Sequence, residues 1–272
     1  MSEPGAQPAI DIAGWAVTLL DFGALHAPLR WVFPDAVEDE LAWLPSRGLL
    51  LCREDEVVLV DCGLGPYGDI FGFELRHVAL SDALAATAVR PDDVSAAILT
   101  HLDSDHAGGI VTSRGKGELL PALGPARIVM LDEALDVLDG RTEERSELAE
   151  TIGSALHGAA VDVTGVADGS EVSPGMRLHA APGHRAGHAC VELAAVGERF
   201  VFLADVVHAR EHVEHPEWDF LHDSEPDVAL ATRRSWIEKL AGSDTVVACS
   251  HVDGFGCIER NATGASVWAD VA

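Results

Sequence analysis

The chain has 272 residues, enough for one large α/β domain with a substantial core, and we expect a single domain over residues 1–272. It carries 18 Lys and Arg against 45 Asp and Glu, a formal net charge of −27. Such a surface repels phosphate backbones and anionic bilayers, so we expect neither a nucleic-acid partner nor a membrane partner.

The composition also bears on the compartment. No apolar run reaches the roughly 20 residues that span a bilayer, and the first eight residues lack the basic segment and apolar core of a secretory signal. We therefore expect a soluble, cytoplasmic protein. The five cysteines are an odd number, which indicates reduced thiols rather than a disulfide framework. Of these, Cys52, Cys62, Cys190 and Cys249 lie in apolar contexts and are predicted to be core residues.

In chain order, the first predicted elements are strands. Residues 15–20, 48–52 and 57–60 are apolar runs, and the charged turn at 53–56 joins the last two into a hairpin. Further strands are predicted over 96–99, 176–181, 199–204 and 245–250, and helices over 80–89, 132–138, 142–157 and 227–240. Strands in both halves, each followed by helices, indicate an α/β sandwich of two packed sheets with helices outside.

The segment after the strand at 96–99 has the densest chemistry of the chain. His101, Asp103, Asp105 and His106 fall within six positions, and Gly108-Gly109 allows the backbone to turn sharply after them. We place these side chains on a loop at the sheet edge, where binding groups usually lie. A solvated acidic turn in which the histidines cap a helix is the simpler alternative. Two imidazoles and two carboxylates on one turn favour a metal site.

Three later strands also deliver ligand-type residues at their ends. The strand at 176–181 leads into Pro182-Gly183-His184, the strand at 199–204 into Asp205, and the strand at 245–250 into His251. Strand ends of an open sheet converge on one crevice, so these distant residues are expected to share a site.

Together these residues resemble the metallo-β-lactamase superfamily of hydrolases, whose pattern is His-x-His-x-Asp-His, a Pro-Gly-His turn, an Asp after a strand, and a late His. The resemblance implies an αββα sandwich and a centre of two divalent metal ions, most often zinc, whose bound hydroxide cleaves the substrate. The lactonase and organophosphate-hydrolase branch is the most similar. The implied metal ligands are His101, Asp103, Asp105, His106, His184, Asp205 and His251.

In relatives the motif residues divide between two metal positions. The first position would hold His101, Asp103 and His184, and the second Asp105, His106 and His251, with Asp205 bridging. The earlier Asp61, after the strand at 57–60, is similar to the aspartate with which the family braces the metal loop.

Asp103 departs from the pattern, because the family normally has its second motif histidine there. A carboxylate can ligate zinc at about the same distance as an imidazole, but it adds one negative charge. We therefore predict a less acidic bound water and a higher pH optimum, and an oxygen ligand could shift the metal toward manganese or iron. Two alternatives stay open. Asp103 could face solvent and leave a mononuclear centre of Asp105, His106 and His251, or the site could be metal-free.

Two residues are predicted to be catalytic. Asp105 can move a proton to the leaving oxygen. His208 stands three residues after Asp205, where lactonases of the superfamily have a tyrosine that hydrogen-bonds the substrate carbonyl, and an imidazole can donate the same bond. A solvent-facing or merely packed His208 is the alternative. The segments 26–34, which contains Trp31 and Phe33, and 206–218 are predicted to shape the pocket.

The resulting functional hypothesis is a metal-dependent hydrolase of a small ester, lactone or related acyl compound. Phosphotriester hydrolysis and a mononuclear iron persulfide dioxygenase of the same fold are the alternatives, with a metal-free binding protein as a third. The expected partner is a small-molecule substrate, and the oligomeric state is open, a homodimer being one option.

Overall fold

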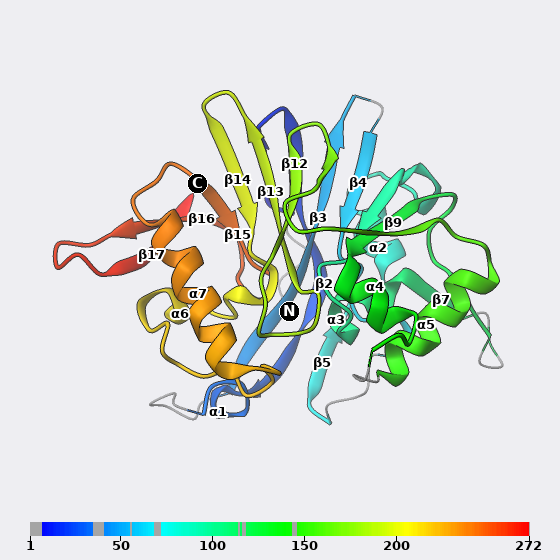
Figure 1. The fold of residues 1–272 in the computed structure, drawn as a ribbon, viewed down its shortest axis with the longest axis horizontal. Coiled ribbons are helices and arrows are strands. Elements are labelled where there is room, and N and C mark those ends of the chain that lie inside the picture. The colour runs from blue at the N-terminus through cyan, green and yellow to red at the C-terminus, as the bar shows by residue number, and fades with distance from the viewer. Residues whose placement is uncertain are drawn as a thin grey trace.

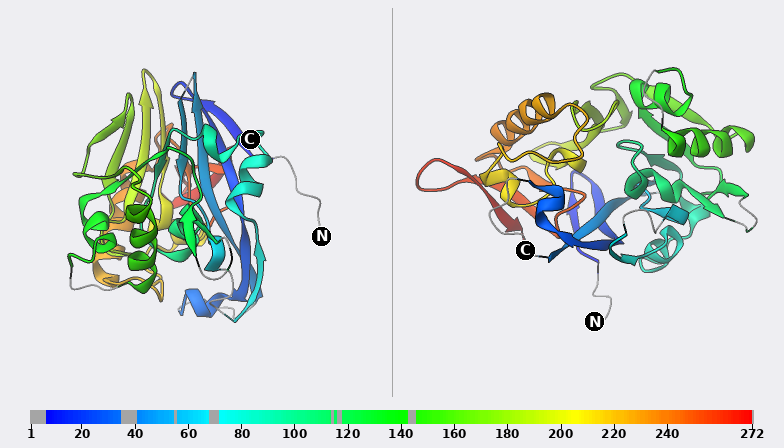
Figure 2. Two further views of the ribbon diagram at one scale, coloured as in Figure 1. Left: turned by 90° about the vertical axis from the view of Figure 1, so that its right-hand side faces the viewer. Right: turned by 90° about the horizontal axis from the view of Figure 1, so that it is seen from below.

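The structure, a computed structural model, describes residues 7–34, 41–54, 56–67, 72–113, 115, 118–142 and 146–271. Within these residues two large sheets stand face to face, with helices on their outer sides (Figures 1 and 2). This is the predicted αββα sandwich. None of the helices in the described ranges is both long and apolar enough to cross a bilayer.

The first sheet comes from the N-terminal part of the chain. Its described strands run in the order β1-β2-β3-β4-β6-β9-β10, with β5 also paired to β2. The pairs that join β4, β6, β9 and β10 are parallel, and those that join β1, β2, β3, β4 and β5 are antiparallel. The bounds are β1 Ala9–Ile12, β2 Trp15–Pro28, β3 Leu41–Arg53, β4 Glu56–Val60, β5 Glu74–His77, β6 Ala96–Ile98, β9 Arg127–Leu131 and β10 Val163–Val166.

The second sheet comes from the C-terminal part, and its strands are paired in sequence order from β11 to β17. Within the described residues of this second sheet, only β14 and β15 pair in parallel, because helix α7 connects them. The bounds are β11 Glu171–Ser173, β12 Met176–Ala180, β13 Ala189–Ala195, β14 Glu198–Phe202, β15 Val246–Ala248, β16 Phe255–Arg260 and β17 Ser266–Val271. A separate small hairpin pairs β7 Val111–Ser113 with β8 Leu119–Pro121.

The helices belong to the outer layers and to the loops at the strand ends. The α-helices are α1 Leu29–Val32, α2 Leu80–Ala85, α3 Ser104–Ala107, α4 Asp132–Leu138, α5 Glu147–Gly158, α6 Glu211–Glu214 and α7 Pro226–Leu240. Single 3-10 turns lie at Gly65–Tyr67, Pro91–Asp93, Gly108–Ile110 and Ala204–Val206.

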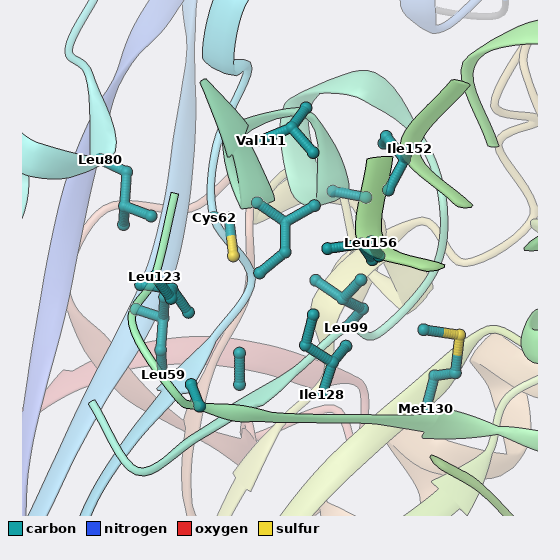
Figure 3. Close-up of a cluster of buried hydrophobic side chains, with 14 of the residues drawn as sticks. Leu59, Cys62, Leu80, Leu99, Val111, Leu123, Ile128, Met130, Ile152 and Leu156 are labelled. Carbon is teal, nitrogen blue, oxygen red and sulfur yellow. The ribbon is translucent and has the colours of Figure 1, made fainter. Parts of the chain in front are cut away.

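Alternation along the strands separates three cores. On β3, Leu49 and Leu51 belong to the core between the two sheets, whereas Leu50 faces the helices of the first layer. Figure 3 shows part of this outer core, in which Leu99 and Ile128 belong to the same buried cluster as Ile152 and Leu156 of α5. A third core packs α7 on the outer face of the second sheet. A period of two places alternate residues on opposite faces of a strand, so strands with apolar side chains on both faces bind the four layers together.

The predicted elements are present, but several of their ends differ from the prediction. β2 continues to Pro28 and β3 begins at Leu41, so both strands are much longer than the predicted runs 15–20 and 48–52. The hairpin of β3 and β4 forms with Arg53 opposite Glu56, and α4 has the predicted bounds. The helix predicted over 80–89 ends at Ala85, and Ala88 has a left-handed φ of 61° that a helix cannot contain. The helix predicted over 142–157 begins at Glu147, because Ser146 caps it by accepting a hydrogen bond from the Ala149 amide; residues 143–145 lie outside the described ranges.

Candidate metal centre

The candidate ligands follow strand ends, as predicted. His101 follows β6, His184 follows β12, and His251 follows β15. Asp205 lies in the 3-10 turn after β14. It follows Ala204 in the chain, and Ala204 has a φ of 47°. A left-handed alanine is strained by about 1–3 kcal/mol, so the surrounding packing fixes the direction in which Asp205 enters the site.

The short helix α3 carries Asp105 and His106 and is tied to the loop after β4. The Cys62 amide donates to the His106 carbonyl at 2.6 Å, and the Gly109 amide donates to the Gly63 carbonyl at 2.7 Å. A side chain at Gly109 would place its Cβ 1.9 Å from the Cys62 carbonyl oxygen. The second motif glycine is therefore required for close approach of the two backbones, and this approach aligns α3 with the sheet.

Asp205 lies between two groups of ligand-type side chains. Its Oδ2 atom is 3.2 Å from Nε2 of His251, 3.4 Å from Nε2 of His184 and 3.8 Å from Nε2 of His101. Its Oδ1 atom is 3.3 Å from Nε2 of His106. The carboxylate is 4% exposed and faces both groups, which is the geometry of a bridging ligand.

The second group consists of Asp105, His106 and His251. Asp105 Oδ2 lies 3.5 Å from His106 Nε2 and 3.6 Å from His251 Nε2. Ligand atoms bound to a tetrahedral zinc ion at about 2.0–2.1 Å lie about 3.3 Å from one another. With the Asp205 distances included, the spacing of these atoms fits one metal ion.

The first group consists of His101, Asp103 and His184. Asp103 Oδ2 lies 3.5 Å from His184 Nε2 and 3.8 Å from His101 Nε2. Its other oxygen, Oδ1, accepts a hydrogen bond from Arg185 Nε at 2.7 Å. Asp103, whose side chain is 28% exposed, thus points one oxygen at the site and the other at a guanidinium.

Several buried polar atoms of both groups have no hydrogen-bond partner within the described part of the chain. They are Nε2 of His101, His106 and His184, and Oδ1 of Asp205. An unpaired buried polar atom costs about 1–3 kcal/mol. Lone pairs from imidazole nitrogens and carboxylate oxygens directed at common points are the donor set of zinc, so the residues fit the metal that this pattern implies.

Outer partners orient the imidazoles of the second group. Asp61 Oδ2 accepts from Nδ1 of His106 at 2.9 Å, and the Pro45 carbonyl accepts from Nδ1 of His251 at 2.7 Å. Asp61 is completely buried and is itself held by the amide and hydroxyl of Thr100. The bracing role predicted for Asp61 is confirmed by this geometry. Each bond directs Nε2 toward the site.

His184 of the first group has a corresponding partner that no motif marks. Asp223, 39 positions further along the chain, accepts from His184 Nδ1 at 2.9 Å. Arg233 on α7 in turn donates to Asp223 at 3.2 Å. The sequence carries no signal for this pair, because it depends on how the loop before α7 folds back over the Pro-Gly-His turn.

The electrostatics of the first group favour a charged His184 and a charged Asp103, whereas burial holds the pKa of His101 well below its usual value. Burial acts to lower the pKa of His184. The carboxylates of Asp103, Asp223 and Asp205 outweigh burial and raise this pKa to about 9. Burial acts to raise the pKa of Asp103. His184 and Arg185 outweigh burial and lower this pKa to about 2. A metal ion that binds here must therefore displace a proton from His184, while Asp103 is already an anion.

His208 lies against the same centre. It is 2% exposed, its Nε2 atom is 3.4 Å from Asp205 Oδ2, and its ring stacks on Phe220 at a centroid distance of 3.5 Å. Burial holds its pKa well below the usual value, so the imidazole is neutral and one of its nitrogens carries a hydrogen. Neither ring nitrogen has a hydrogen-bond partner among the described residues. The solvent-facing alternative is wrong.

A cavity of about 370 Å³ opens onto these residues. Its wall includes Trp31 and Phe33 from the first predicted pocket segment and His208 from the second. The polar side chains that line it are Ser46, Asp103, Ser104, Asp105, Ser146, His184, Arg185, Asp205, His208, His222 and His251. The rest of the wall is apolar: Ala24, Leu25, Trp31, Val32, Phe33, Leu44, Pro45, Leu64, Leu75, Leu102, Leu148 and Phe220.

The other histidines of the region have mixed outcomes. His188 is buried beside the centre, where its Nδ1 donates to the Ala181 carbonyl and its Nε2 accepts from the Asp205 amide. His212 is buried under Phe33, and His215 stacks on Trp218 away from the cavity. His222 lines the cavity. Its distance in sequence from every motif concealed this position.

Comparison with known proteins identifies the class. The family model described as the metallo-β-lactamase superfamily matches residues 42–251. The chain therefore belongs to this superfamily, and its class is that of metal-dependent hydrolases. No curated protein matches the chain.

Solved structures show the same fold. The chain is similar to AidC, a dizinc quorum-quenching lactonase in complex with a product, with a TM-score of 0.82 and 20% identity over 98% of each chain. It is also similar to the hydrolase AbOPH, with a TM-score of 0.83 and 20% identity over 100% of this chain and 99% of the other. An N-acyl homoserine lactone hydrolase gives a TM-score of 0.67 and 20% identity over 86% and 92% of the two chains.

Proposed function

We propose that this protein hydrolyses a small ester or lactone with an apolar acyl part. The reaction takes place at a centre of two divalent ions, for which zinc is the expected metal. The observation that carries the proposal is the cavity, whose apolar wall leads directly to Asp105, Asp205 and His208. A ligand pocket of this kind buries an apolar body and fixes one polar end. The structural neighbour AidC is a dizinc lactonase, which supports the same substrate class and metal.

The ligand assignment follows the two groups. His101, Asp103 and His184 would hold the first ion, Asp105, His106 and His251 the second, and Asp205 would bridge them. When bound, two such ions supply an activated water and polarise the substrate carbonyl. Two compact groups that share Asp205 favour this arrangement over a mononuclear iron dioxygenase.

The remaining chemistry belongs to the chain itself. His208 is neutral and unpaired, so it can donate a hydrogen bond to the carbonyl oxygen, where negative charge develops during acyl transfer. Asp105 lines the cavity and can carry a proton to the leaving oxygen. Apolar side chains such as Trp31 and Phe33 exclude water from the acyl part of the substrate.

A substrate panel tests the proposal. Acyl lactones of increasing chain length, aryl esters and aryl phosphotriesters are compared by kcat/KM with the zinc-loaded protein. We expect the lactones or aryl esters to exceed the phosphotriesters by at least about tenfold, and kcat/KM to rise with acyl length until the cavity is filled. A higher kcat/KM for phosphotriesters would replace the proposed substrate class by the phosphotriester alternative, and oxygen consumption with an iron-loaded protein would favour the dioxygenase.

The cytoplasmic location, the single domain over residues 1–272 and the homodimer option stay predictions of the sequence. They do not affect the chemistry proposed for the site.

A further inference from the structure

Arg185 makes the contact that distinguishes the first metal position from the second. It directly follows His184 in the loop after β12, and its Nε atom donates to Asp103 Oδ1 at 2.7 Å. Asp103 Oδ2 is left to face His184 and His101. The two oxygens of this carboxylate therefore have different partners, one a guanidinium and the other the ligand group.

The guanidinium is held in place by groups other than Asp103. Its Nη1 atom donates to the backbone carbonyls of His184, at 2.8 Å, and His222, and to the hydroxyl of Ser224 at 3.3 Å. Arg185 is about three-quarters buried. A planar guanidinium fixed by several acceptors presents its Nε–H in one direction only, so the contact with Asp103 is preorganised.

A carboxylate in place of an imidazole changes the first position in two ways. It adds a negative charge to a site that already contains Asp105 and Asp205, and it adds a second oxygen that could bind the metal or rotate away from it. Arg185 acts on both changes. Its positive charge offsets the extra negative charge, and its hydrogen bond occupies the second oxygen.

We propose that Arg185 is a positioning residue that makes Asp103 a one-oxygen ligand of balanced charge, so that Asp103 and Arg185 together replace the histidine usual at the first metal position. This inference rests on the proposed metal centre. It implies that the two residues are coupled. In Asp103→His alone, the new imidazole faces the hydrogen-bond donor and the positive charge of Arg185. In the double variant Asp103→His with Arg185→Gln, the imidazole is neutral and no cation opposes the metal.

A double-mutant cycle tests the coupling through metal binding rather than turnover. The wild type, Asp103→His, Arg185→Gln and the double variant are stripped of metal and titrated with Co²⁺, and the visible absorption band and the two dissociation constants are recorded. Each single change is expected to weaken one Co²⁺ site, the first position, by about 10–100-fold and to leave the other site within about threefold. The double variant is expected to bind within about threefold of the wild type at both sites.

Two controls separate coupling from general damage. Arg199→Gln removes an ion pair with Glu192 on the second sheet and should leave both constants unchanged. The melting temperature of each metal-free protein reports the loss of the contacts with His184 and His222, which the double variant also lacks, so recovery of metal binding cannot arise from restored stability. If Arg185→Gln does not fold, Arg185→Lys replaces it, with an expected loss of at least about fivefold at the first position.

The outcomes are distinct. The role of Arg185 would be overturned if the losses of Co²⁺ affinity in the two single variants multiply in the double variant. It would also be overturned if the single variants bind Co²⁺ like the wild type. A wild type that takes up fewer than two Co²⁺ ions would instead contradict the proposed dinuclear centre.

Discussion

The second metal position takes its ligands from α3 and the loop after β15, and its outer contacts come from Asp61 and a backbone carbonyl. The proposed first position has Asp103 where the motif has a histidine, and it is surrounded by the charged side chains of Arg185, Asp223 and Arg233. The second group is supported by an aspartate that the sequence marks and by the backbone. In the proposed first position, the changed residue is accompanied by charged side chains from loops that no motif describes.

The largest effect is expected at the residue that both positions share. Asp205→Ala removes the carboxylate that faces His106 with one oxygen and His184 and His251 with the other. We expect metal content to fall from two ions to fewer than one per chain and turnover to fall by about 1,000-fold, which corresponds to about 4 kcal/mol. Elemental analysis and kcat/KM measure both.

Asp270→Ala is the matched control, because Asp270 on β17 forms an exposed ion pair with Arg210. It should retain both ions. Loss of metal from one position only in Asp205→Ala would show that Asp205 does not bridge.

A smaller effect on turnover is expected at His208, which lines the substrate cavity and is not one of the proposed metal ligands. His208→Phe preserves the stacking on Phe220 but removes the hydrogen-bond donor. We expect kcat to fall by about 100-fold with two ions still bound, since loss of one such donor costs about that much. A decrease of less than a few-fold would leave His208 as a packed residue. His215→Phe, on the same segment but stacked on Trp218, should change kcat little.

The outer aspartates allow the two positions to be weakened separately. Asp61→Asn should weaken the second position and Asp223→Asn the first, each by about 10–100-fold in metal affinity, because each carboxylate orients one ligand imidazole. Zinc competition titrations with a chelator measure the two constants. If either substitution weakens both positions equally, the support of the two sites is shared rather than separate.

The pH dependence of metal binding tests both positions, because Asp205 and Asp105 outweigh burial and raise the pKa values of His106 and His251 in the second group as well. The pKa of His184 is raised to about 9, so at lower pH the metal must displace a proton from it. The affinity of the first position should therefore fall about tenfold for each pH unit below 9 from this group alone. Zinc titrations at about pH 7 and about pH 8, with the proton release measured by calorimetry in two buffers, test the sign. An affinity that rises at the lower pH would contradict the protonated His184.

Much of this site could be predicted from sequence, because its ligands follow apolar strands and are spaced as a motif. His101, Asp105, His106, His184, Asp205 and His251 are brought together as the motif implies. The sandwich itself follows from strands with two apolar faces, such as β3, and from helices such as α4 with clear limits.

The residues around the first group and the cavity that no motif marks could not be predicted in this way. Asp223, Arg185 and His222 belong to loops whose direction depends on tertiary packing, and no local pattern distinguishes them from solvated side chains. Arg185 was adjacent to a motif histidine, yet only the fold shows that its guanidinium turns toward Asp103. The sequence-based prediction of a higher pH optimum did not include this positive charge.

The central claim is a pair of metal ions with Asp103 as a ligand of the first. Anomalous diffraction at the zinc edge from crystals of the zinc-loaded protein tests it directly. We expect two peaks, one of them about 2.0–2.2 Å from Asp103 Oδ2 and bound also by His101 and His184. A single peak at Asp105, His106 and His251, or two peaks with Asp103 turned away from both, would contradict it.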